Sequence, residues 1–358
     1  MKIGIDISQI VYDTGVSAYT KALVKALLAI DQENQYTLFG GSARLLPVLN
    51  DYVNSLQGNP EKKVFPIPPT LADWLFNILR FPPIETLIGQ VDVFHSSDWT
   101  QPKTSAAKVT TVHDLAPLRF PRETHPRIVA VHKRRLDLVK KEVDLVIVPS
   151  DATRDDLVDF GVGAEKIRVI PEAPTIIKQK ATPEEIEAVK KKYKIDDQYL
   201  ITVGVGKRKN TKRLIKAFEN ARVGRNLKLV LLGRNDLGYP EERGLRFTGH
   251  VTKEEYSALV SGAEALVYPS LFEGFGLPIL EGFAAGVPVV TSNVSSLPQV
   301  AGEGAVMVNP YEVDSITEGI KEALKNPKKL IQRGSKRLQD FSWEETARKT
   351  LAVYNELC

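Results

Sequence analysis

Two glutamates, Glu273 and Glu281, lie in the stretch "YPSLFEGFGLPILEGFAAGVPVV", which is otherwise built from glycine, proline and apolar residues. Pro278 follows two loop glycines, and proline favours the first turn of a helix because its missing N–H would have no partner there. The pattern therefore predicts a helix that begins at about residue 278. Glu273 would lie in the loop before this helix, and Glu281 about one turn inside it.

Such a helix start could bind an anion, because its first amides lack partners and the positive end of the helix dipole lies there. The glycines would let a phosphorylated ligand approach the backbone closely, and a carboxylate can accept hydrogen bonds from the vicinal hydroxyls of ribose. One loop could thus bind ribose, phosphate and sugar. In the plainer alternative, Glu281 only interacts with the positive end of the helix dipole, which stabilises the helix by about 0.3 to 1 kcal/mol, and Glu273 is a surface charge.

The segment "EGFGLPILEGFAAGVPVV" resembles the Glu, seven residues, Glu signature of the retaining glycosyltransferases of family four. The segments "TGVSAYTKAL", "VTTVHDLAPLRFP", "VPSDATRDDL", "GKRKNTKRLIKAF" and "FTGHVTKEEYSALVSGAEALVYPS" also occur in the family's order, so the resemblance covers nearly the whole chain. It implies that Glu281 holds the ribose of a sugar nucleotide and that Glu273 contacts the transferred sugar. The amides of Phe275, Gly276 and Leu277 would complete the donor pocket.

The segment "GKRKNTKRLIKAF" follows a predicted strand and is rich in cations. The resemblance implies a pair of cations that neutralises the departing diphosphate, and Lys209 matches its second member. The first member, usually an arginine several residues earlier, is missing, so either Lys207 or Arg208 would replace it. We include Arg208 with Lys209 in the predicted site, whereas Lys212 and Arg213 fit a solvated helix face better.

Two motifs of the first half contribute to the predicted site. The segment "VTTVHDLAPLRF" puts His113 and Asp114 at the end of a strand, where histidine can donate to a sugar hydroxyl or assist proton transfer. We expect His113 to be catalytic together with Glu273 and Lys209, while Asp114 could equally cap the next loop. In "DTGVSAYT", Gly15 precedes a helix, and the resemblance implies a contact with the diphosphate and the acceptor.

The segment "LADWLFNILRFPP" clusters large apolar residues, and the helix predicted over 125–143 carries many bases. Together they could rest against an anionic membrane. Core packing of the aromatic residues and a solvated face for the bases are the favoured interpretation.

The elements that position these residues alternate between short β-branched runs and longer amphipathic runs, which is typical of an α/β protein with parallel sheets. In the first half, strands are predicted over 2–8, 36–40, 92–97, 108–114 and 144–150, and helices over 16–30 and 125–143 and after Ser150. A second series begins with "YLITVGVG" and continues through "LKLVLLG", "LRFTGHV", "ALVYPS", "VPVVTS" and "AVMVNP". The charged residues 178–198 suggest a solvated connector with an exposed helix that starts at Pro183.

The resemblance implies the GT-B architecture, with two Rossmann-like lobes whose parallel sheets face a central cleft. We expect residues 1–174 to form the acceptor-side lobe and 175–341 the lobe that binds the nucleotide sugar. A final helix over 342–358, capped by Ser342, would pack back on the first lobe.

Composition supports an ordinary globular protein, with 43% hydrophobic and 26% charged residues in 358. About 150 residues per domain gives two domains. Lysine and arginine (48) nearly balance aspartate and glutamate (44), which does not indicate nucleic-acid binding. The start lacks a signal-peptide pattern, no apolar run approaches the roughly 20 residues of a membrane span, and the lone Cys358 excludes an intrachain disulfide. We expect a cytoplasmic protein, with attachment to a membrane surface left open.

The predicted function is transfer of a hexose from a nucleotide-diphosphate sugar to a saccharide or lipid-linked acceptor in surface glycan synthesis, with retention. No cofactor and no metal are expected, and no Asp-x-Asp pair occurs. The "HDLAP" variant resembles bacterial mannosyltransferases, which suggests GDP-mannose as donor. Three alternatives stay open: a GT-B sugar-nucleotide epimerase, a sugar-nucleotide-binding module without catalytic activity, and an NAD-dependent enzyme. The segment "GVGKRK" argues against the last, because it has lysine where the Gly-x-Gly-x-x-Gly fingerprint has its third glycine.

Overall fold

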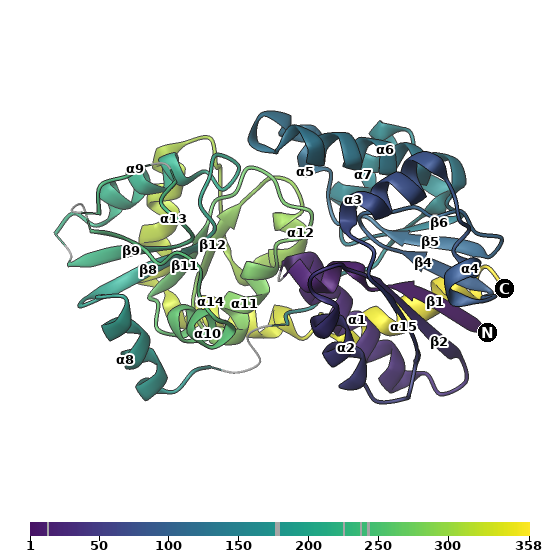
Figure 1. Cartoon of the computed structure of the whole chain (residues 1–358). Coiled ribbons are helices and arrows are strands. Elements are labelled where there is room, and N and C mark those ends of the chain that lie inside the picture. Colours follow the sequence, from purple (N-terminus) through teal and green to yellow (C-terminus); the bar gives the residue numbers. More distant parts are fainter. Residues whose placement is uncertain (13, 176–179, 225, 237, 242–243) are drawn as a thin grey trace. The chain divides into compact units, whose positions relative to one another are not determined.

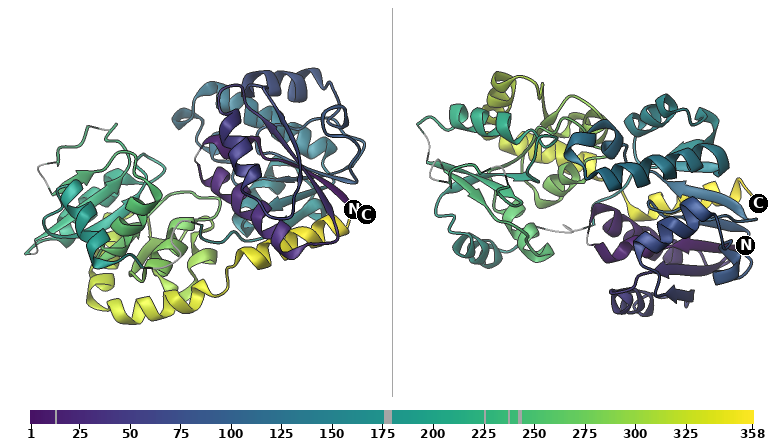
Figure 2. Two further views of the ribbon diagram at one scale, coloured as in Figure 1. Left: turned by 60° about the horizontal axis from the view of Figure 1, so that its bottom comes forward. Right: turned by 45° about the horizontal axis from the view of Figure 1, so that its top comes forward.

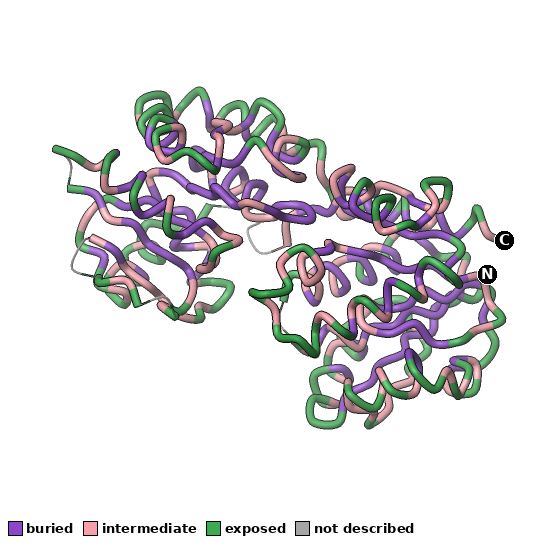
Figure 3. The backbone as a smooth tube through the Cα atoms, turned by 90° about the horizontal axis from the view of Figure 1, so that it is seen from above, coloured by how far each residue is buried: buried purple, intermediate pink, exposed green. Residues whose placement is uncertain are grey.

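The computed structural model of the chain describes residues 1–12, 14–175, 180–224, 226–236, 238–241 and 244–358. The chain divides into an amino-terminal unit, Met1–Glu172 with Ser342–Cys358, and a carboxy-terminal unit, Ala173–Phe341 (Figure 1). This division lies two residues before the expected boundary at 174. The central strands of both sheets are buried along most of their length, whereas the outer strands are less so, and the exposed residues lie mainly on helices and loops (Figure 3).

The amino-terminal unit is built on a sheet of seven parallel strands in the order β3-β2-β1-β4-β5-β6-β7. The strands are β1 (Lys2–Asp6), β2 (Gln35–Gly41), β3 (Glu61–Phe65), β4 (Val93–Ser96), β5 (Ala107–Thr111), β6 (Leu145–Val148) and β7 (Ile167–Val169). The edge strand β3, "EKKVF", was not predicted, because charged side chains mask its strand pattern, as is common at sheet edges.

Helices cover this sheet. They are η1 (Ser8–Tyr12), α1 (Gly15–Ile30), α2 (Leu46–Asn54), α3 (Pro69–Ala72), η2 (Asp73–Leu79), α4 (Glu85–Ile88), α5 (Ala116–Arg119), η3 (Pro121–Glu123), α6 (Pro126–Glu142), α7 (Asp151–Phe160), η4 (Ala164–Lys166) and α15 (Trp343–Asn355). Local signals set the bounds of α7: Ser150 Oγ accepts a hydrogen bond from the Thr153 amide at 3.2 Å, and Gly161 ends the helix with φ of 100°.

The helix α15 belongs to the amino-terminal unit although it ends the chain. It packs along α1, and Figure 2 shows it in yellow beside the purple helices of that unit. Tyr354 is fully buried there, and Thr346 Oγ1 donates to the carbonyl of Pro171 at 2.8 Å. Ser342 caps α15 by accepting a hydrogen bond from the Glu345 amide, the contact that the sequence predicts.

The carboxy-terminal unit has six parallel strands in the order β10-β9-β8-β11-β12-β13. These are β8 (Gln198–Val203), β9 (Leu227–Leu232), β10 (Leu245–Phe247), β11 (Ala265–Tyr268), β12 (Val289–Ser292) and β13 (Val306–Val308). Its described helices are α8 (Pro183–Lys192), α9 (Thr211–Ala221), α10 (Lys253–Ser261), α11 (Leu277–Ala285), α12 (Leu297–Ala301), η6 (Gly302–Gly304), α13 (Val313–Lys325) and α14 (Pro327–Leu338).

The helix α8 is more than the solvated connector that its composition suggests. It packs against α10 and buries Val189 in the core of the carboxy-terminal unit. Residues 178 and 179 of the predicted connector lie outside the described residues. Over the described part of the chain, no helix combines the length and the apolar character that crossing a membrane requires.

Candidate active site

The loop between β11 and α11 turns at Gly276, whose φ is 114°. A Cβ on this residue would lie 2.7 Å from Leu297 Cδ2, so both the backbone conformation and the space require glycine. The helix begins at Leu277, one residue before the predicted start, with Pro278 in its first turn. Gly276, Leu277 and Pro278 therefore form a tight turn that leads into a helix, as the sequence indicates.

Two serines hold the carbonyls of this loop. Ser296 Oγ donates to the carbonyls of Glu273 at 2.9 Å and Phe275 at 2.7 Å, and Ser295 Oγ donates to Glu273 O at 2.7 Å. Within the described chain, the amides of Phe275, Gly276 and Leu277 donate no hydrogen bond. The amino end of α11 thus offers the three amides predicted to bind a diphosphate. Nothing in the sequence spacing marks the two serines as their support.

Glu273 is 8% exposed and lies between two cations. Its Oε1 accepts a hydrogen bond from Lys209 Nζ at 2.6 Å, and its Oε2 accepts one from Arg208 Nη1 at 2.8 Å. Burial opposes the charge of this carboxylate, but Lys209 and Arg208 outweigh burial and hold the pKa of Glu273 below its ordinary value. The carboxylate is therefore ionised at neutral pH, and the two cations are fixed beside the amino end of α11.

Lys209 is oriented from a second side by Tyr268, the last residue of β11. Its Nζ donates to the Tyr268 hydroxyl at 2.5 Å and lies 4.8 Å from the centroid of the ring. Arg208, the neighbour of Lys209, joins it on Glu273, whereas Lys207 is exposed. Of the two candidates for the missing arginine, Arg208 is thus the one that shares a carboxylate partner with Lys209. Lys212 is exposed, as a solvated face predicts.

Glu281 lies on α11 and points toward α10, where the Tyr256 hydroxyl donates a hydrogen bond to its Oε2. It is 3% exposed. Burial raises the pKa of Glu281 to about 7, although the bond from Tyr256 acts in the opposite direction. Glu273 is buried as well, so it is not the surface charge of the plainer interpretation. Tyr256 was not predicted, because nothing in the sequence around it signals that it faces Glu281.

In the amino-terminal unit, His113 follows the carboxyl end of β5. Its Nδ1 lies 2.9 Å from Oε1 of Glu172, a carboxylate that is 5% exposed. Burial opposes the imidazolium, but the hydrogen bond and charge of Glu172 outweigh it and raise the pKa of His113. The contact assigns Nδ1–H as a donor to Glu172, so Nε2 is the ring nitrogen that this contact does not use. Glu172, in the segment "PEAP", was not predicted.

Tyr19 of α1 lies edge-on to His113, with ring centroids 4.6 Å apart. Gly15 is the first residue of the same helix and is exposed, with no atom within 4 Å of where its Cβ would be. Asp114 Oδ1 accepts a hydrogen bond from the Ala116 amide at 2.8 Å and so caps the following loop. The structure thus brings His113 together with Glu172 and Tyr19.

Two family descriptions match the chain in succession. "Glycosyltransferase Family 4" matches residues 14–173, and "Glycosyl transferases group 1" matches residues 184–337. The chain belongs to the family-four glycosyltransferases. Each matched range falls almost wholly in one of the two structural units.

Relatives of this glycosyltransferase include the O-antigen chain mannosyltransferase B of Escherichia coli, 28% identical over 96% of both chains. The MMP alpha-(1->4)-mannosyltransferase of Mycolicibacterium hassiacum is 31% identical over 60% of this chain and 54% of its own length. The structure of sucrose-phosphate synthase from Thermosynechococcus elongatus matches 100% of this chain and 99% of its own, with a TM-score of 0.75 and 19% identity. The fold is GT-B, as the sequence predicts.

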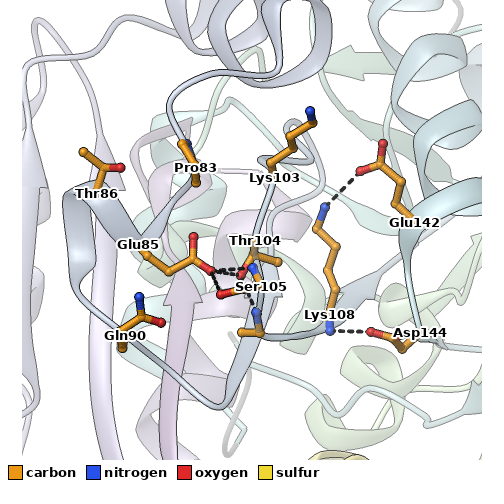
Figure 4. A pocket seen from close by; sticks show the side chains of 11 residues that line it. Pro83, Glu85, Thr86, Gln90, Lys103, Thr104, Ser105, Lys108, Glu142 and Asp144 are labelled. Carbon is orange, nitrogen blue, oxygen red and sulfur yellow. Dashed lines mark hydrogen bonds and ion pairs between the residues drawn. The ribbon is translucent and has the colours of Figure 1, made fainter.

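The glycosyltransferase has a further hollow of about 840 Å³ at the amino ends of β5 and β6, the edge of the sheet opposite His113 (Figure 4). Several of its charged groups have partners within the protein: Lys108 Nζ lies 3.7 Å from Glu142 Oε2, and Asp144 accepts a hydrogen bond from the Lys108 amide at 2.8 Å. Glu85 accepts hydrogen bonds from Thr104 and Ser105. We assign no substrate to this hollow.

Proposed function

We propose that this glycosyltransferase moves mannose from GDP-mannose to a saccharide or lipid-linked acceptor in surface glycan synthesis, with retention of the anomeric configuration. One observation carries the proposal: Lys209 and Arg208 converge on buried Glu273 beside the unpaired amides at the amino end of α11. This arrangement suits a ligand that joins a diphosphate to a sugar. The mannosyltransferase relatives support the choice of sugar.

The donor is assigned to the carboxy-terminal unit. Glu281 accepts hydrogen bonds from the ribose hydroxyls, and the amides of Phe275, Gly276 and Leu277 contact the diphosphate. Negative charge grows on the diphosphate as it leaves, and donors already aimed at those oxygens lower the barrier. Because Lys209 and the adjacent guanidinium supply this positive charge, we propose that the reaction needs no divalent metal.

The acceptor is assigned to His113 of the amino-terminal unit. With Nδ1–H held by Glu172, Nε2 is available to a sugar hydroxyl. The bond between the anomeric carbon and the phosphate oxygen breaks while the acceptor oxygen bonds to the same face of that carbon. The acceptor's proton passes to the departing phosphate, so no glutamate nucleophile is required. Ionised Glu273 positions the transferred sugar.

We propose a cytoplasmic enzyme that contacts a membrane peripherally, since a lipid-linked acceptor would lie in one. The exposed Cys358 is the one cysteine of the sequence, which fits a reducing compartment.

A panel of sugar nucleotides in a thermal-shift assay tests the donor. A ligand at 100 times its Kd stabilises the folded state by about 2.7 kcal/mol, so GDP-mannose should raise the Tm more than other sugar nucleotides. Glu281→Ala should remove the shift, whereas Glu318→Ala, at an exposed position of α13, should keep it. If no sugar nucleotide shifts the Tm, the proposed donor site is wrong.

Transfer itself is measured as GDP release that depends on a saccharide acceptor. The rate should be unchanged by EDTA if Lys209 and Arg208 replace a metal. Formation of an altered free sugar without acceptor would instead identify an epimerase, and binding without any product would identify a silent binding module.

A further inference from the structure

A group of exposed apolar side chains projects from the segment that follows β3. Of the twelve large apolar side chains exposed among the described residues, five fall within residues 71–81. They are Leu71 (40% exposed), Trp74 (49%), Ile78 (51%), Leu79 (49%) and Phe81 (63%). We call these five side chains the apolar ridge. The expected core packing of the aromatic residues is wrong for Trp74 and Phe81 but right for Phe76, which is buried.

The backbone beneath the ridge is fixed to the amino-terminal unit. Phe76 is buried at 1% exposure, and Asn77 Nδ2 donates to the carbonyl of Trp99 at 3.0 Å. Asn77 Oδ1 in turn accepts a hydrogen bond from the Gln101 amide at 2.8 Å. The ridge is therefore the outer face of an anchored helical segment.

Part of the ridge lies on one helical face. Trp74 and Ile78 are four residues apart on η2, a π-helix with more than four residues per turn, so they project from the same side, and Leu71 lies on α3 just before it. An apolar stripe at this spacing normally packs against another element. Exposed apolar patches of this kind mark sites of interaction with proteins or membranes.

A row of cations runs beside the ridge on α6. Arg134 Nη1 contacts both carboxylate oxygens of Asp73 at 2.9 and 3.0 Å, and Arg80 contacts Glu142. The first contact joins Asp73, the first residue of η2, to the middle of α6. The second joins Arg80, the residue after η2, to the last residue of α6. The two helices therefore run side by side in the same direction.

Arg127, Arg134 and Lys141 recur every seven residues on α6 and so share one stripe of that helix, with a drift of about 20° per step. Arg134 lies in this stripe, so the stripe borders η2. We call these three residues the cationic stripe. Arg127 and Lys141 are exposed, as are Lys133 and Lys140 on the neighbouring face of α6; the exposed acids of α6 are Asp137 and Glu142. The border of the ridge is thus mainly positive.

We propose that the apolar ridge and the cationic stripe form a docking surface for a bilayer that contains anionic lipids. Trp74 and Phe81 would enter the boundary between headgroups and acyl chains, while the cationic stripe contacts lipid phosphates. Charge complementarity favours this occupant over an uncharged apolar partner. The inference rests on the proposed function for its purpose, since it would bring the enzyme to a lipid-linked acceptor, but vesicle binding tests it without any transfer reaction.

Flotation of the full chain with vesicles tests the surface. Vesicles of phosphatidylcholine mixed with phosphatidylglycerol should carry the protein, phosphatidylcholine alone should not, and salt should weaken binding. The double variant Trp74→Ser with Phe81→Ser should lower the bound fraction at least tenfold. The matched control is Val223→Ser with Tyr311→Ser, which removes exposed apolar side chains (80% and 57%) of the carboxy-terminal unit and should bind as wild type.

Charge-reversal variants and tryptophan fluorescence provide two independent tests of the docking surface. Arg127→Glu with Lys141→Glu should abolish binding to the mixed vesicles, whereas Lys321→Glu on α13 should not. Mixed vesicles should shift the tryptophan emission to the blue, and Trp74→Phe should remove that shift while binding persists. Only two other tryptophans, Trp99 and Trp343, are present in the sequence.

The proposal is overturned if the mixed vesicles do not bind, if the ridge variant binds like its control, or if phosphatidylcholine alone binds equally well. Self-association in size-exclusion chromatography that the ridge variant abolishes would instead identify the ridge as a protein interface. An unchanged Tm increase with GDP-mannose in the ridge variant shows that it is folded. Loss of vesicle binding with this increase intact separates failure of docking from failure of the donor site.

Discussion

The Tyr256 hydroxyl and the Glu281 carboxylate form a buried hydrogen-bonded pair between α10 and α11. Burial makes the charge of Glu281 unfavourable, and one of its carboxylate oxygens is already held by the phenol. In the proposed function, the other oxygen would accept a hydrogen bond from ribose. The pair should therefore make the stability of the protein, and the proposed donor binding, depend on pH.

Glu281→Gln should stabilise the ligand-free protein at alkaline pH. The unfolded chain releases the Glu281 proton near pH 4.5, whereas the folded protein keeps it to about pH 7. The free energy of unfolding therefore falls between these pH values, by about 3 kcal/mol, and stays lower above pH 7. Urea unfolding at pH 5 and pH 8 should show a gain for the variant only at pH 8. Equal effects at both pH values would contradict a raised pKa.

Tyr256→Phe should weaken donor binding in a pH-dependent way. Without the phenol, the pKa of Glu281 should rise further, because the hydrogen bond that lowers it is gone. At pH 7 we expect a five- to tenfold higher Kd for the sugar nucleotide, corresponding to about 1 to 1.4 kcal/mol. Raising the pH to 9 should recover most of the affinity, measured by calorimetry. Tyr199→Phe, which removes a buried hydroxyl bonded to the Leu259 carbonyl, is the control and should leave this profile unchanged.

Glu273→Gln should separate catalysis from donor binding. The variant keeps the shape of the side chain but leaves Lys209 and Arg208 without their anion, which should cost about 3 to 5 kcal/mol of stability in the free protein. A nucleoside diphosphate should restore part of this loss, because its charge replaces the carboxylate. We expect kcat to fall about 100-fold or more while donor binding persists. Unchanged kcat in acceptor-dependent GDP release would exclude Glu273 from the reaction.

Glu172→Gln should destabilise the amino-terminal unit mainly at acidic pH. Glu172 raises the pKa of His113 above 6.5. The pair therefore contributes fully to the free energy of unfolding below pH 6.5, and this contribution is lost as the pH rises through the raised pKa. Urea unfolding should therefore show a larger loss at pH 6 than at pH 9. The pH profile of kcat/KM should also move, since the pKa of His113 would fall. Glu165→Gln, at an exposed residue of the same unit, supplies the comparison.

Much of the carboxy-terminal site could be predicted from local sequence. Gly276 and Pro278 specify the turn and the helix start through backbone geometry alone, and Glu273 and Glu281 keep their places relative to that turn. Their partners could not be predicted in this way. Tyr256 and Ser296 reach the loop from other elements, and no spacing along the chain reports that approach.

The amino-terminal unit shows two further limits of sequence analysis. The charged edge strand β3 lacks the apolar run of its buried neighbours. The residues around Trp74 have the periodicity of a core helix, but periodicity does not tell whether another element covers the apolar face. For Phe76 the face is covered, and for Trp74 it is open to solvent.

The place of α15 has a consequence for biosynthesis. The carboxy-terminal unit has its whole chain once Phe341 has been made, but the amino-terminal unit needs Ser342–Cys358, whose Tyr354 is fully buried against it. The later unit can therefore finish folding first, and the earlier one must wait, with part of its apolar surface open, until residues 342–358 are available.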